Sequence, residues 1–262
     1  MEQTVLIERD AARRMTTLTL NRPARRNALN LPLLDAFKTA IADASVDPSL
    51  RVLVLRGAGP AFCSGMDLAE TAKEPIKAVE RVRDVFLALA TCPLVTIALV
   101  HGAAVAGGGG LAAACDFVVM ADDARIGFPE VKRGLVAALV AALLRRQLRE
   151  SDLRELLLVG ELIPAVRAEK IGLAHRVVVA TELASTAQNI ARAVCEGGPG
   201  AIAETKALLG RLAPRSLADD FAIALETHGR TRDSAEAREG SRAFLEKRRP
   251  TWTADHGATS LS

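Results

Sequence analysis

Four consecutive glycines, residues 107–110, lie between two apolar segments of the chain, 93–100 and 117–120. Both segments are rich in β-branched residues and predict buried strands. Glycine loses more conformational freedom on folding than any other residue, so a run of four needs a physical reason. One reason is that backbone N–H groups at a helix N-terminus must come close to an anion, or to an oxygen that gains negative charge. The run therefore predicts a turn and a short helix whose first amides face a ligand.

Two other interpretations of the glycines stay open at this point. In the first, they only allow a short helix to pack closely on a sheet. In the second, Gly107, Gly109 and Ala112 match the dinucleotide-binding pattern G-x-G-x-x-G/A, with Asp122 and Asp123 downstream. A single match of this kind is weak, and residues 101–106 insert a loop between the strand and the glycines. This loop disfavours a dinucleotide site, which binding of NAD(P) would reveal.

The overall charge of the 262-residue chain limits its partners. The net charge is only +3, which does not predict a strong attraction to nucleic acid or to a membrane surface. Seven Phe, one Trp and no Tyr leave few side chains for stacking on bases. We therefore expect neither nucleic acid nor a membrane as a partner. A chain of this length buries a large core without a disulfide or a metal ion.

The four cysteines, Cys63, Cys92, Cys115 and Cys195, show no C-x-x-C spacing and lie in apolar sequence. They are expected to be small buried residues, with no metal site. The N-terminus has no basic region followed by an apolar one, as a signal peptide would have. The longest apolar run, 94–100, is too short to span a bilayer. A cytoplasmic location is the expectation.

The order of the expected elements predicts an α/β fold. Strands are expected over 5–8, 15–20, 51–56, 93–100, 117–120 and 175–179, and helices over 31–44, 75–90, 137–148, 152–159 and 164–171. Alternation of this kind predicts stacked strands with helices outside. After the last strand only helices are expected, over 182–196, 201–212, 217–227 and 231–248. The chain is therefore divided into an α/β part, 1–180, and a helical part, 181–262.

Two further segments carry groups suited to catalysis. Residues 57–68 form a second glycine-rich turn that runs into a short helix, so its backbone N–H groups are as available as those of residues 107–110. Ser64 lies there, but no G-x-S-x-G pattern surrounds it, which disfavours a nucleophilic serine. Glu130 follows Phe128 and Pro129 in apolar surroundings. Partial burial would raise the pKa of this carboxyl toward neutral pH, which suits an acid or base.

Five separated motifs share an order and a spacing with a known family. They are Asn21-Arg22-Pro23 with Arg26-Asn27-Ala28-Leu29, residues 61–68, the glycine run through Cys115-Asp116, Phe128-Pro129-Glu130, and residues 243–248. Together they resemble the crotonase (enoyl-CoA hydratase/isomerase) superfamily, over about residues 5–252. The resemblance implies a crotonase-like ββα spiral core with a C-terminal helical region that forms trimers, often stacked as hexamers.

The resemblance also implies a chemistry. Members bind an acyl-CoA thioester and stabilise its enolate with two backbone N–H groups, which correspond here to Met66 and Gly107, or to Gly108 if the alignment shifts by one. Glu130 corresponds to the catalytic acid or base. No separate cofactor is implied, because coenzyme A is part of the substrate. Removal of one such N–H donor typically raises the barrier by about 2.7–4 kcal/mol.

The resemblance assigns further residues to coenzyme A. The backbone around Ser64, Asp67 and Leu68 corresponds to the segment that meets the adenine. Three basic residues are candidates for its phosphates, Arg25 and Arg26 from the same subunit and Lys247 from a neighbouring one. For these charges a solvated surface is an equally good interpretation. The acyl chain is expected to lie between residues 71–83 and 134–143.

Three positions depart from the family pattern. Gly110 replaces the second glutamate of typical hydratases, Ala138 replaces an aspartate that some isomerases and dehalogenases use, and His101 stands where asparagine is usual. One base suffices to move a proton between two carbons of a bound enolate, which favours a double-bond isomerase, although hydration is the commoner activity of the family. A catalytically weak acyl-CoA-binding protein on the same scaffold is the alternative.

Overall fold

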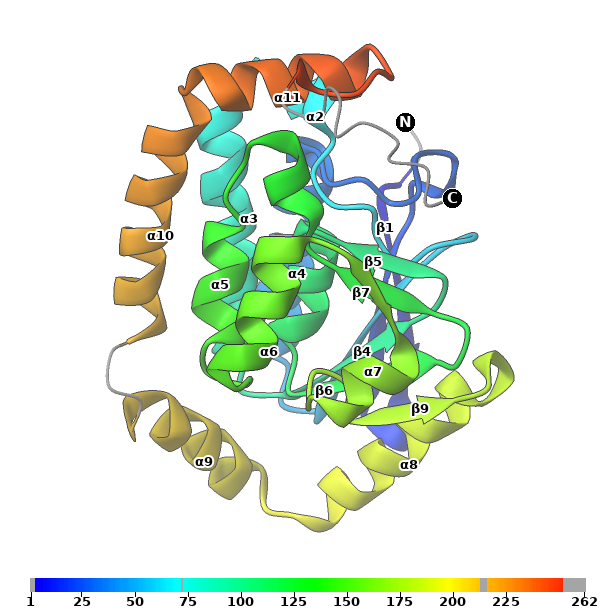
Figure 1. Cartoon of the computed structure of the whole chain (residues 1–262). Coiled ribbons are helices and arrows are strands. Elements are labelled where there is room, and N and C mark those ends of the chain that lie inside the picture. Colours follow the sequence, from blue (N-terminus) through cyan, green and yellow to red (C-terminus); the bar gives the residue numbers. More distant parts are fainter. Residues whose placement is uncertain (1–2, 72, 213–215, 252–262) are drawn as a thin grey trace.

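The computed structural model describes residues 3–71, 73–212 and 216–251, and its largest sheet is mostly parallel (Figure 1). Its strands, in spatial order, are β1 (Val5–Asp10), β2 (Met15–Leu20), β3 (Val52–Gly57), β4 (Val95–Val100), β6 (Phe117–Ala121) and β9 (Arg176–Val178). β1 and β2 pair antiparallel, and every later neighbour pairs parallel. All six residues of β4 are buried, as expected for a parallel strand covered on both faces.

A second sheet lies beside the first and was not predicted. It consists of β5 (Ala103–Val105), β7 (Arg125–Gly127) and β8 (Leu162–Pro164), each of three residues. β5 occupies the loop expected between β4 and the glycines, so the glycines do not follow the β4 strand directly. The dinucleotide-binding pattern requires that direct connection.

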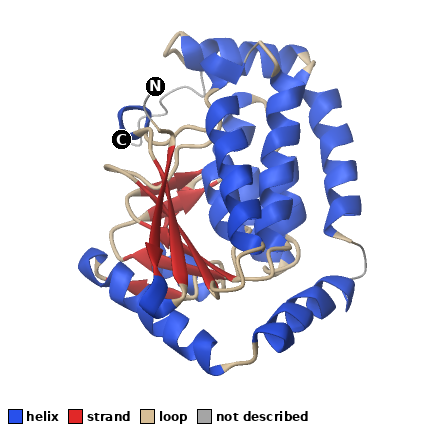
Figure 2. Ribbon diagram, turned by 180° about the vertical axis from the view of Figure 1, so that it is seen from behind, coloured by secondary structure: helices blue, strands red, loops and turns tan. Residues whose placement is uncertain are grey.

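Helices pack against the sheets, and Figure 2 shows a layer of them beside the strands. They are α1 (Leu31–Ser45), α2 (Leu68–Thr71), α3 (Pro75–Ala90), α4 (Gly107–Ala113), α5 (Ala138–Leu144), α6 (Glu150–Arg154) and α7 (Ala165–Lys170). Shorter 3-10 turns are η1 (Ala11–Arg13), η2 (Pro23–Arg25), η3 (Pro129–Arg133) and η5 (Ala180–Glu182), and a π-helical segment, η4 (Glu155–Val159), continues α6. The largest fully buried side chains include Phe37, Phe62, Phe86, Phe128 and Phe221.

The C-terminal helices wrap around the α/β part. α8 (Leu183–Glu196) packs on β3, β4 and β6, and α9 (Pro199–Leu212) follows along the same end of the molecule (Figure 1). α10 (Leu217–Arg232) then runs along α3 and α5, and α11 (Ala235–Leu245) packs on η3. The α/β part and the helical part are therefore in direct contact.

The expected break between the last two helices, at 227–231, is wrong. α10 continues through Gly229 to Arg232, and the chain turns at Asp233. The stop is set by Ser234, whose hydroxyl accepts a hydrogen bond from the Ala237 N–H and caps α11. A single glycine costs a helix only about 1 kcal/mol, so Gly229 does not end α10.

The cysteines largely follow the prediction. Cys63, Cys92 and Cys115 are buried and Cys195 is half-buried, all as free thiols. Burial raises the pKa of the Cys63 thiol to about 12, and its Sγ lies 3.1 Å from the Asn27 carbonyl oxygen. Among the residues that the structure describes, no cluster of three or more His, Cys, Asp or Glu is arranged to hold a metal ion. No helix in the described ranges has the length and apolar character needed to cross a bilayer.

Candidate active site

Two loops run side by side at the carboxyl ends of β3 and β4. The Cys63 N–H donates to the Ala103 carbonyl over 3.1 Å, and the Val105 N–H donates to the Cys63 carbonyl over 2.9 Å. These bonds pair the loop after β3 with β5. The glycine-rich turn of residues 57–68 is thereby held against the segment that enters α4.

Asn27 holds the first of these loops in place. Its side chain is fully buried, and its amide donates to the carbonyls of Ala58, Ala61 and Phe62 at 2.9, 2.8 and 3.1 Å. Its side-chain oxygen accepts from the Arg22 N–H over 2.9 Å. Asn27 therefore supplies partners for loop carbonyls that would otherwise be buried without one.

Gly65 brings the two expected oxyanion amides together. Its φ of +88° is one that glycine adopts without strain. A Cβ at Gly65 would lie 2.8 Å from the Val105 carbonyl oxygen and 3.5 Å from the Gly107 nitrogen, so the Gly65–Met66 backbone lies against the start of α4. Within the described residues, neither the Met66 N–H nor the Gly107 N–H donates to another protein group. Both residues line the same pocket.

Ala106 precedes α4 in an unusual conformation. Its φ of 54° and ψ of −124° are rarely adopted by residues other than glycine, and such conformations cost about 1–3 kcal/mol. Its N–H donates to the Gly127 carbonyl over 2.8 Å, which anchors the turn to β7. The turn directs the chain from β5 into α4, where Gly107 is the first helical residue.

The remaining three glycines of the run make close contacts inside the protein. A Cβ at Gly108 would lie 2.3 Å from the Cys63 carbonyl oxygen, and one at Gly109 would lie 2.7 Å from the Phe128 ring. A Cβ at Gly110 would lie 2.3 Å from the Phe86 ring. Tight packing thus accounts for residues 108–110, whereas Gly107 borders the pocket.

Glu130 lies in η3 with its carboxyl group in the pocket. Its Oε2 is buried and has no hydrogen-bond partner within the described structure. Burial raises the pKa of Glu130 to about 7, and the charge of Arg133 lowers the pKa by a smaller amount. Arg133 itself stacks over the Phe244 ring of α11, with its guanidinium carbon 4.1 Å from the ring centroid.

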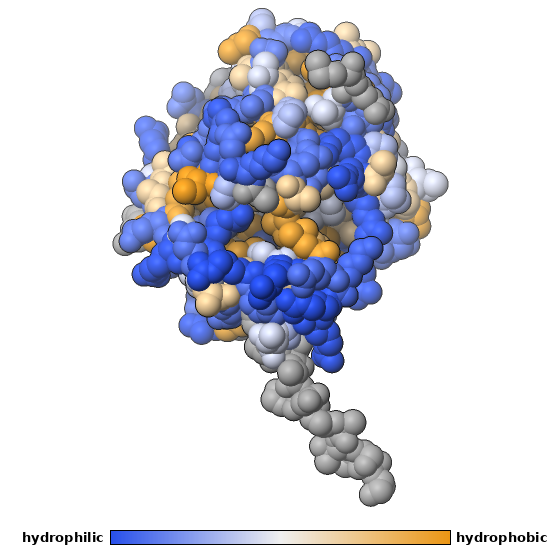
Figure 3. Space-filling model, turned by 90° about the horizontal axis from the view of Figure 1, so that it is seen from above, coloured by the Kyte–Doolittle hydropathy of each residue, from blue (hydrophilic) through white to orange (hydrophobic). Residues whose placement is uncertain are grey.

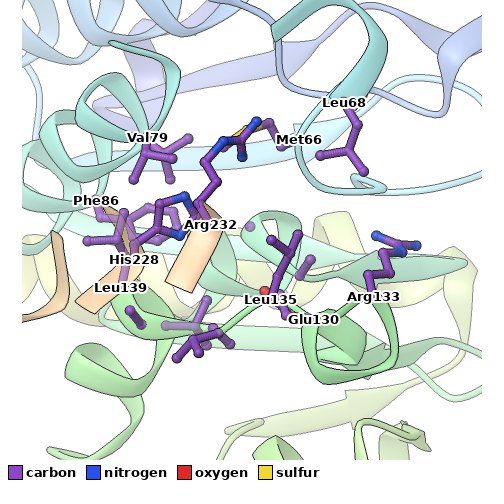
Figure 4. Close-up of a pocket in the computed structure, with 17 residues that line it drawn as sticks. Met66, Leu68, Val79, Phe86, Glu130, Arg133, Leu135, Leu139, His228 and Arg232 are labelled. Atoms are coloured by element: carbon purple, nitrogen blue, oxygen red, sulfur yellow. The ribbon is translucent and has the colours of Figure 1, made fainter. Parts of the chain in front are cut away.

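The pocket joins all three residues expected to act on the substrate. Figure 4 shows Glu130 and Met66 on opposite sides of an apolar space bounded by α3 and α5. The full lining comprises Met66, Leu68, Val79, Val82, Phe86, Ala106, Gly107, Glu130, Arg133, Leu135, Val136, Ala137, Ala138, Leu139, Val140, His228 and Arg232. Glu130 is the only carboxylate in this lining, and both segments expected to enclose the acyl chain contribute to it.

The residues expected to bind coenzyme A lie in different surroundings. Ser64 is joined to the exposed loop of Arg25 and Arg26. Its N–H donates to the Arg26 carbonyl over 3.0 Å, and its hydroxyl donates to the Arg25 carbonyl over 3.4 Å. Leu68 lines the pocket, and Lys247 is exposed at the end of α11. On this end of the molecule the surface is hollowed, with apolar side chains inside a mostly hydrophilic rim (Figure 3).

Asp67 is engaged within the protein. Its Oδ2 lies 3.2 Å from the Arg22 guanidinium, and both side chains are almost fully buried. Arg22 also binds Glu70 over 2.6 Å. The Asp67 Oδ1 accepts a hydrogen bond from the Glu70 N–H over 3.2 Å, which stabilises the start of α2, and the Asp67 N–H donates to the Leu29 carbonyl over 2.9 Å.

His228 and Arg232 were not anticipated as site residues. Both come from α10, about a hundred residues after Glu130, and line the pocket from the side of the C-terminal helices. Their spacing of four places them on one face of a helix, but this spacing alone does not show what the face contacts.

Comparison with known proteins gives one consistent result. Residues 10–255 match the family model described as enoyl-CoA hydratase/isomerase. A protein of Thermus thermophilus, named a putative enoyl-CoA hydratase, is 39% identical over 238 residues, covering 88% of this chain and 94% of its own.

Solved structures agree with this match. A crystal structure of an enoyl-CoA hydratase from Mycobacterium avium has a TM-score of 0.85 at 32% identity, and covers 96% of this chain and 100% of its own. Another from Mycobacterium smegmatis has a TM-score of 0.78 at 35% identity, with the same coverage. The similarity therefore extends through the C-terminal helices as well as the α/β part.

Proposed function

The chain belongs to the enoyl-CoA hydratase/isomerase family of the crotonase superfamily, and on this premise we propose that Glu130 moves a proton on a bound acyl-CoA thioester. The observation that carries the proposal is the Glu130 carboxyl group, whose Oε2 is buried without a hydrogen-bond partner in the described structure and which lines the same pocket as Met66 and Gly107. A pKa of about 7 allows this group both to accept and to donate a proton near neutral pH.

The two backbone amides supply the electrostatic part of the mechanism. The Met66 and Gly107 N–H groups hold the thioester oxygen, which gains negative charge as the enolate forms. They are free for this because neither donates elsewhere in the described structure. The helix dipole of α4 adds favourable potential at Gly107, its first residue. Only the backbone is used, so a methionine side chain at position 66 does not interfere.

The reaction is either hydration or double-bond isomerisation of an enoyl-CoA. The single carboxylate of the pocket favours isomerisation, in which Glu130 removes a proton from one carbon of the acyl chain and returns it to another. The Phe86 ring supports this choice, because it fills the space into which a side chain at Gly110 would extend. Hydratases of the family generally have a second glutamate at that position, which holds the water molecule that is added to the double bond.

Coenzyme A and the assembly complete the proposal. Arg25 and Arg26 bind phosphates of coenzyme A from the same subunit, beside the Ser64 backbone, and Lys247 reaches a neighbouring subunit's ligand. The protein assembles as a trimer or hexamer through its C-terminal helices. Exposed apolar side chains on α9 and α11 support this assembly, among them Leu209, Leu212 and Phe244.

Replacement of Glu130 by glutamine tests the catalytic role. Glu130→Gln keeps the shape of the side chain and removes its proton-transfer capacity, so kcat should fall by about 10²–10⁴-fold. Binding of butyryl-CoA, a saturated thioester that cannot react, should change little. Turnover is measured by product analysis on 2-enoyl- and 3-enoyl-CoA thioesters of several chain lengths, and binding by calorimetry.

Glu80→Gln is the matched control, because Glu80 is exposed on α3 and should be replaced without loss of turnover. Turnover that survives Glu130→Gln contradicts the assignment. If the unmodified protein binds acyl-CoA but converts no member of the panel, the second candidate holds, a binding protein on the crotonase scaffold. The absence of a carboxylate at Gly110 and at Ala138 is the observation that favours this candidate.

A further inference from the structure

Two polar side chains enter the pocket from α10, the His228 imidazole and the Arg232 guanidinium. Figure 4 shows His228 next to Phe86 and Leu139, with Arg232 one helical turn further along. Near its N-terminal end α10 packs on α3, where the Phe221 and Phe86 ring centroids lie 6.4 Å apart. His228 and Arg232 therefore line the pocket from a helix that packs on α3, with Arg232 drawn toward Met66 in Figure 4.

Arg232 brings a positive charge that the protein does not neutralise. Within the described residues it forms no salt bridge or hydrogen bond, although it is half-buried. Burial lowers the pKa of Arg232, and the adjacent Asp233 opposes this through its charge without a direct contact. The other arginine of the pocket, Arg133, is stacked on Phe244.

His228 has a buried ring nitrogen that also lacks a partner within the protein. Its Nε2 has no hydrogen-bond partner in the described structure, like Oε2 of Glu130 in the same pocket. Burial lowers the pKa of His228, the charge of Arg232 lowers it further, and hydrogen bonding to the Val136 backbone opposes both. A negatively charged ligand group beside this imidazole would favour its protonated form, whose Nε2–H is a donor.

The rest of the acyl pocket is apolar. Val79, Val82, Leu139 and Val140 line it together with Phe86. A plain hydrocarbon chain would fit these side chains, but would leave the Arg232 guanidinium and His228 Nε2 without partners when it excluded water. A buried polar group without a partner is costly, and a buried charge more so.

We propose that the preferred substrates are acyl-CoA thioesters whose acyl chain ends in a second carboxylate, bound by Arg232 and by Nε2 of His228. The inference rests on the proposed function, since it assumes that the thioester carbonyl lies at Met66 and Gly107. Arg232 and His228 then act as specificity residues, and Glu130 remains the group that moves the proton. A guanidinium suits this role because it binds a carboxylate through two parallel hydrogen bonds.

Binding of unreactive thioesters tests the inference. Succinyl-, glutaryl- and adipoyl-CoA are each compared by calorimetry with the monocarboxylic thioester of the same carbon number, butyryl-, pentanoyl- and hexanoyl-CoA. We expect at least one dicarboxylic thioester to bind about tenfold more tightly than its partner. Arg232→Met should abolish that preference and leave the affinity for free coenzyme A unchanged, whereas Arg232→Lys should retain part of it.

Arg230→Met is the matched control, because Arg230 is exposed on the same helix. Equal affinities within every pair would overturn the inference and leave the proposed function intact. So would an equal loss of all ligands, including free coenzyme A, in Arg232→Met, since Arg232 would then bind the coenzyme. If no CoA ligand binds the unmodified protein, both the proposed function and this inference are wrong.

Discussion

Gly110 and Phe86 together define which catalytic groups the pocket holds. A Cβ at position 110 would lie 2.3 Å from the Phe86 ring, and Phe86 is fully buried between α3, α4 and α10. At the position where the resemblance places the second glutamate of typical hydratases, this structure has an aromatic surface. Restoring the glutamate alone would force this ring to move, so the substitution at 110 and the position of Phe86 are coupled.

Glu130 illustrates the cost of burying a carboxyl group. Below its ordinary pKa of 4.5 the group is protonated in the folded and unfolded chains alike, and its burial is inexpensive. Between pH 4.5 and about 7 it ionises in the unfolded chain only, which favours unfolding. Stability therefore falls as pH rises through this interval, by about 3 kcal/mol in total.

Glu130→Gln should therefore stabilise the protein in a pH-dependent way. Glutamine is uncharged in both states, so the free energy of unfolding should exceed that of the wild type by up to about 3 kcal/mol at pH 8. The difference should shrink toward zero below pH 4.5, where both side chains are uncharged. Urea unfolding at several pH values measures it, with Glu80→Gln as control. A difference that does not vary with pH would contradict the buried-carboxyl account.

At this scale the sequence indicated candidate site residues more readily than the pocket that surrounds them. Met66, Gly107 and Glu130 sit in motifs, and the structure brings all three to one pocket. His228 and Arg232 could not be found, because no local pattern shows that α10 returns to α3 and α5. Asp67 was expected at the adenine, yet only the folded chain reveals Arg22 as its partner.

The short helix α4 acts as a spacer between two loops. Its glycines allow the helix to approach the Cys63 backbone on one face and the rings of Phe128 and Phe86 on its other faces. That close approach brings the first amide of α4 next to the Gly65–Met66 backbone. The interpretations of the glycine run as close packing and as amide presentation are therefore two aspects of the same helix.

Gly108→Ala should damage both stability and catalysis. The added Cβ would meet the Cys63 carbonyl oxygen at 2.3 Å, so α4 must move away from the loop that carries Met66. We expect the free energy of unfolding to fall by about 1–3 kcal/mol, and kcat to fall more than binding of butyryl-CoA. Thermal unfolding and steady-state kinetics measure these effects.

Gly107→Ala is the matched control for stability. A Cβ there lies 3.4 Å from the Leu29 side chain, which is an ordinary contact. Its stability should equal or slightly exceed that of the wild type, because alanine is the better helix former. If both variants lose the same stability, the helix itself is intolerant of alanine and the contact with Cys63 is not the cause.

Elements were predictable where the apolar pattern is long and local. The expected helix over 75–90 coincides with α3, and the expected strand over 15–20 coincides with β2. The second sheet was missed because β5, β7 and β8 have three residues each, too few for a periodic pattern. β8 also pairs with a strand some forty residues earlier in the chain, which no local pattern indicates.

At the scale of the whole molecule, the four C-terminal helices differ in what they cover. α10 packs on α5 and lines the pocket of its own chain, and α11 packs on η3, which carries Glu130. α9 is tied to the α/β part by Lys206, which donates to the Leu94 carbonyl and to Asp116. Its leucines 208, 209 and 212 are exposed by 44%, 66% and 71%. An apolar surface of this kind usually marks a contact with another protein.

We therefore expect α9 to contribute to the contact between subunits. Light scattering should give three or six times the 27.7 kDa mass of one chain. Leu209→Glu places a charge in that contact and should shift the assembly toward the monomer, because an unpaired charge is costly to bury. Val46→Glu is the control, since Val46 is an exposed apolar residue outside the C-terminal helices, 82% accessible. A monomeric wild type, or an assembly that Leu209→Glu leaves intact, would place these leucines outside any subunit contact.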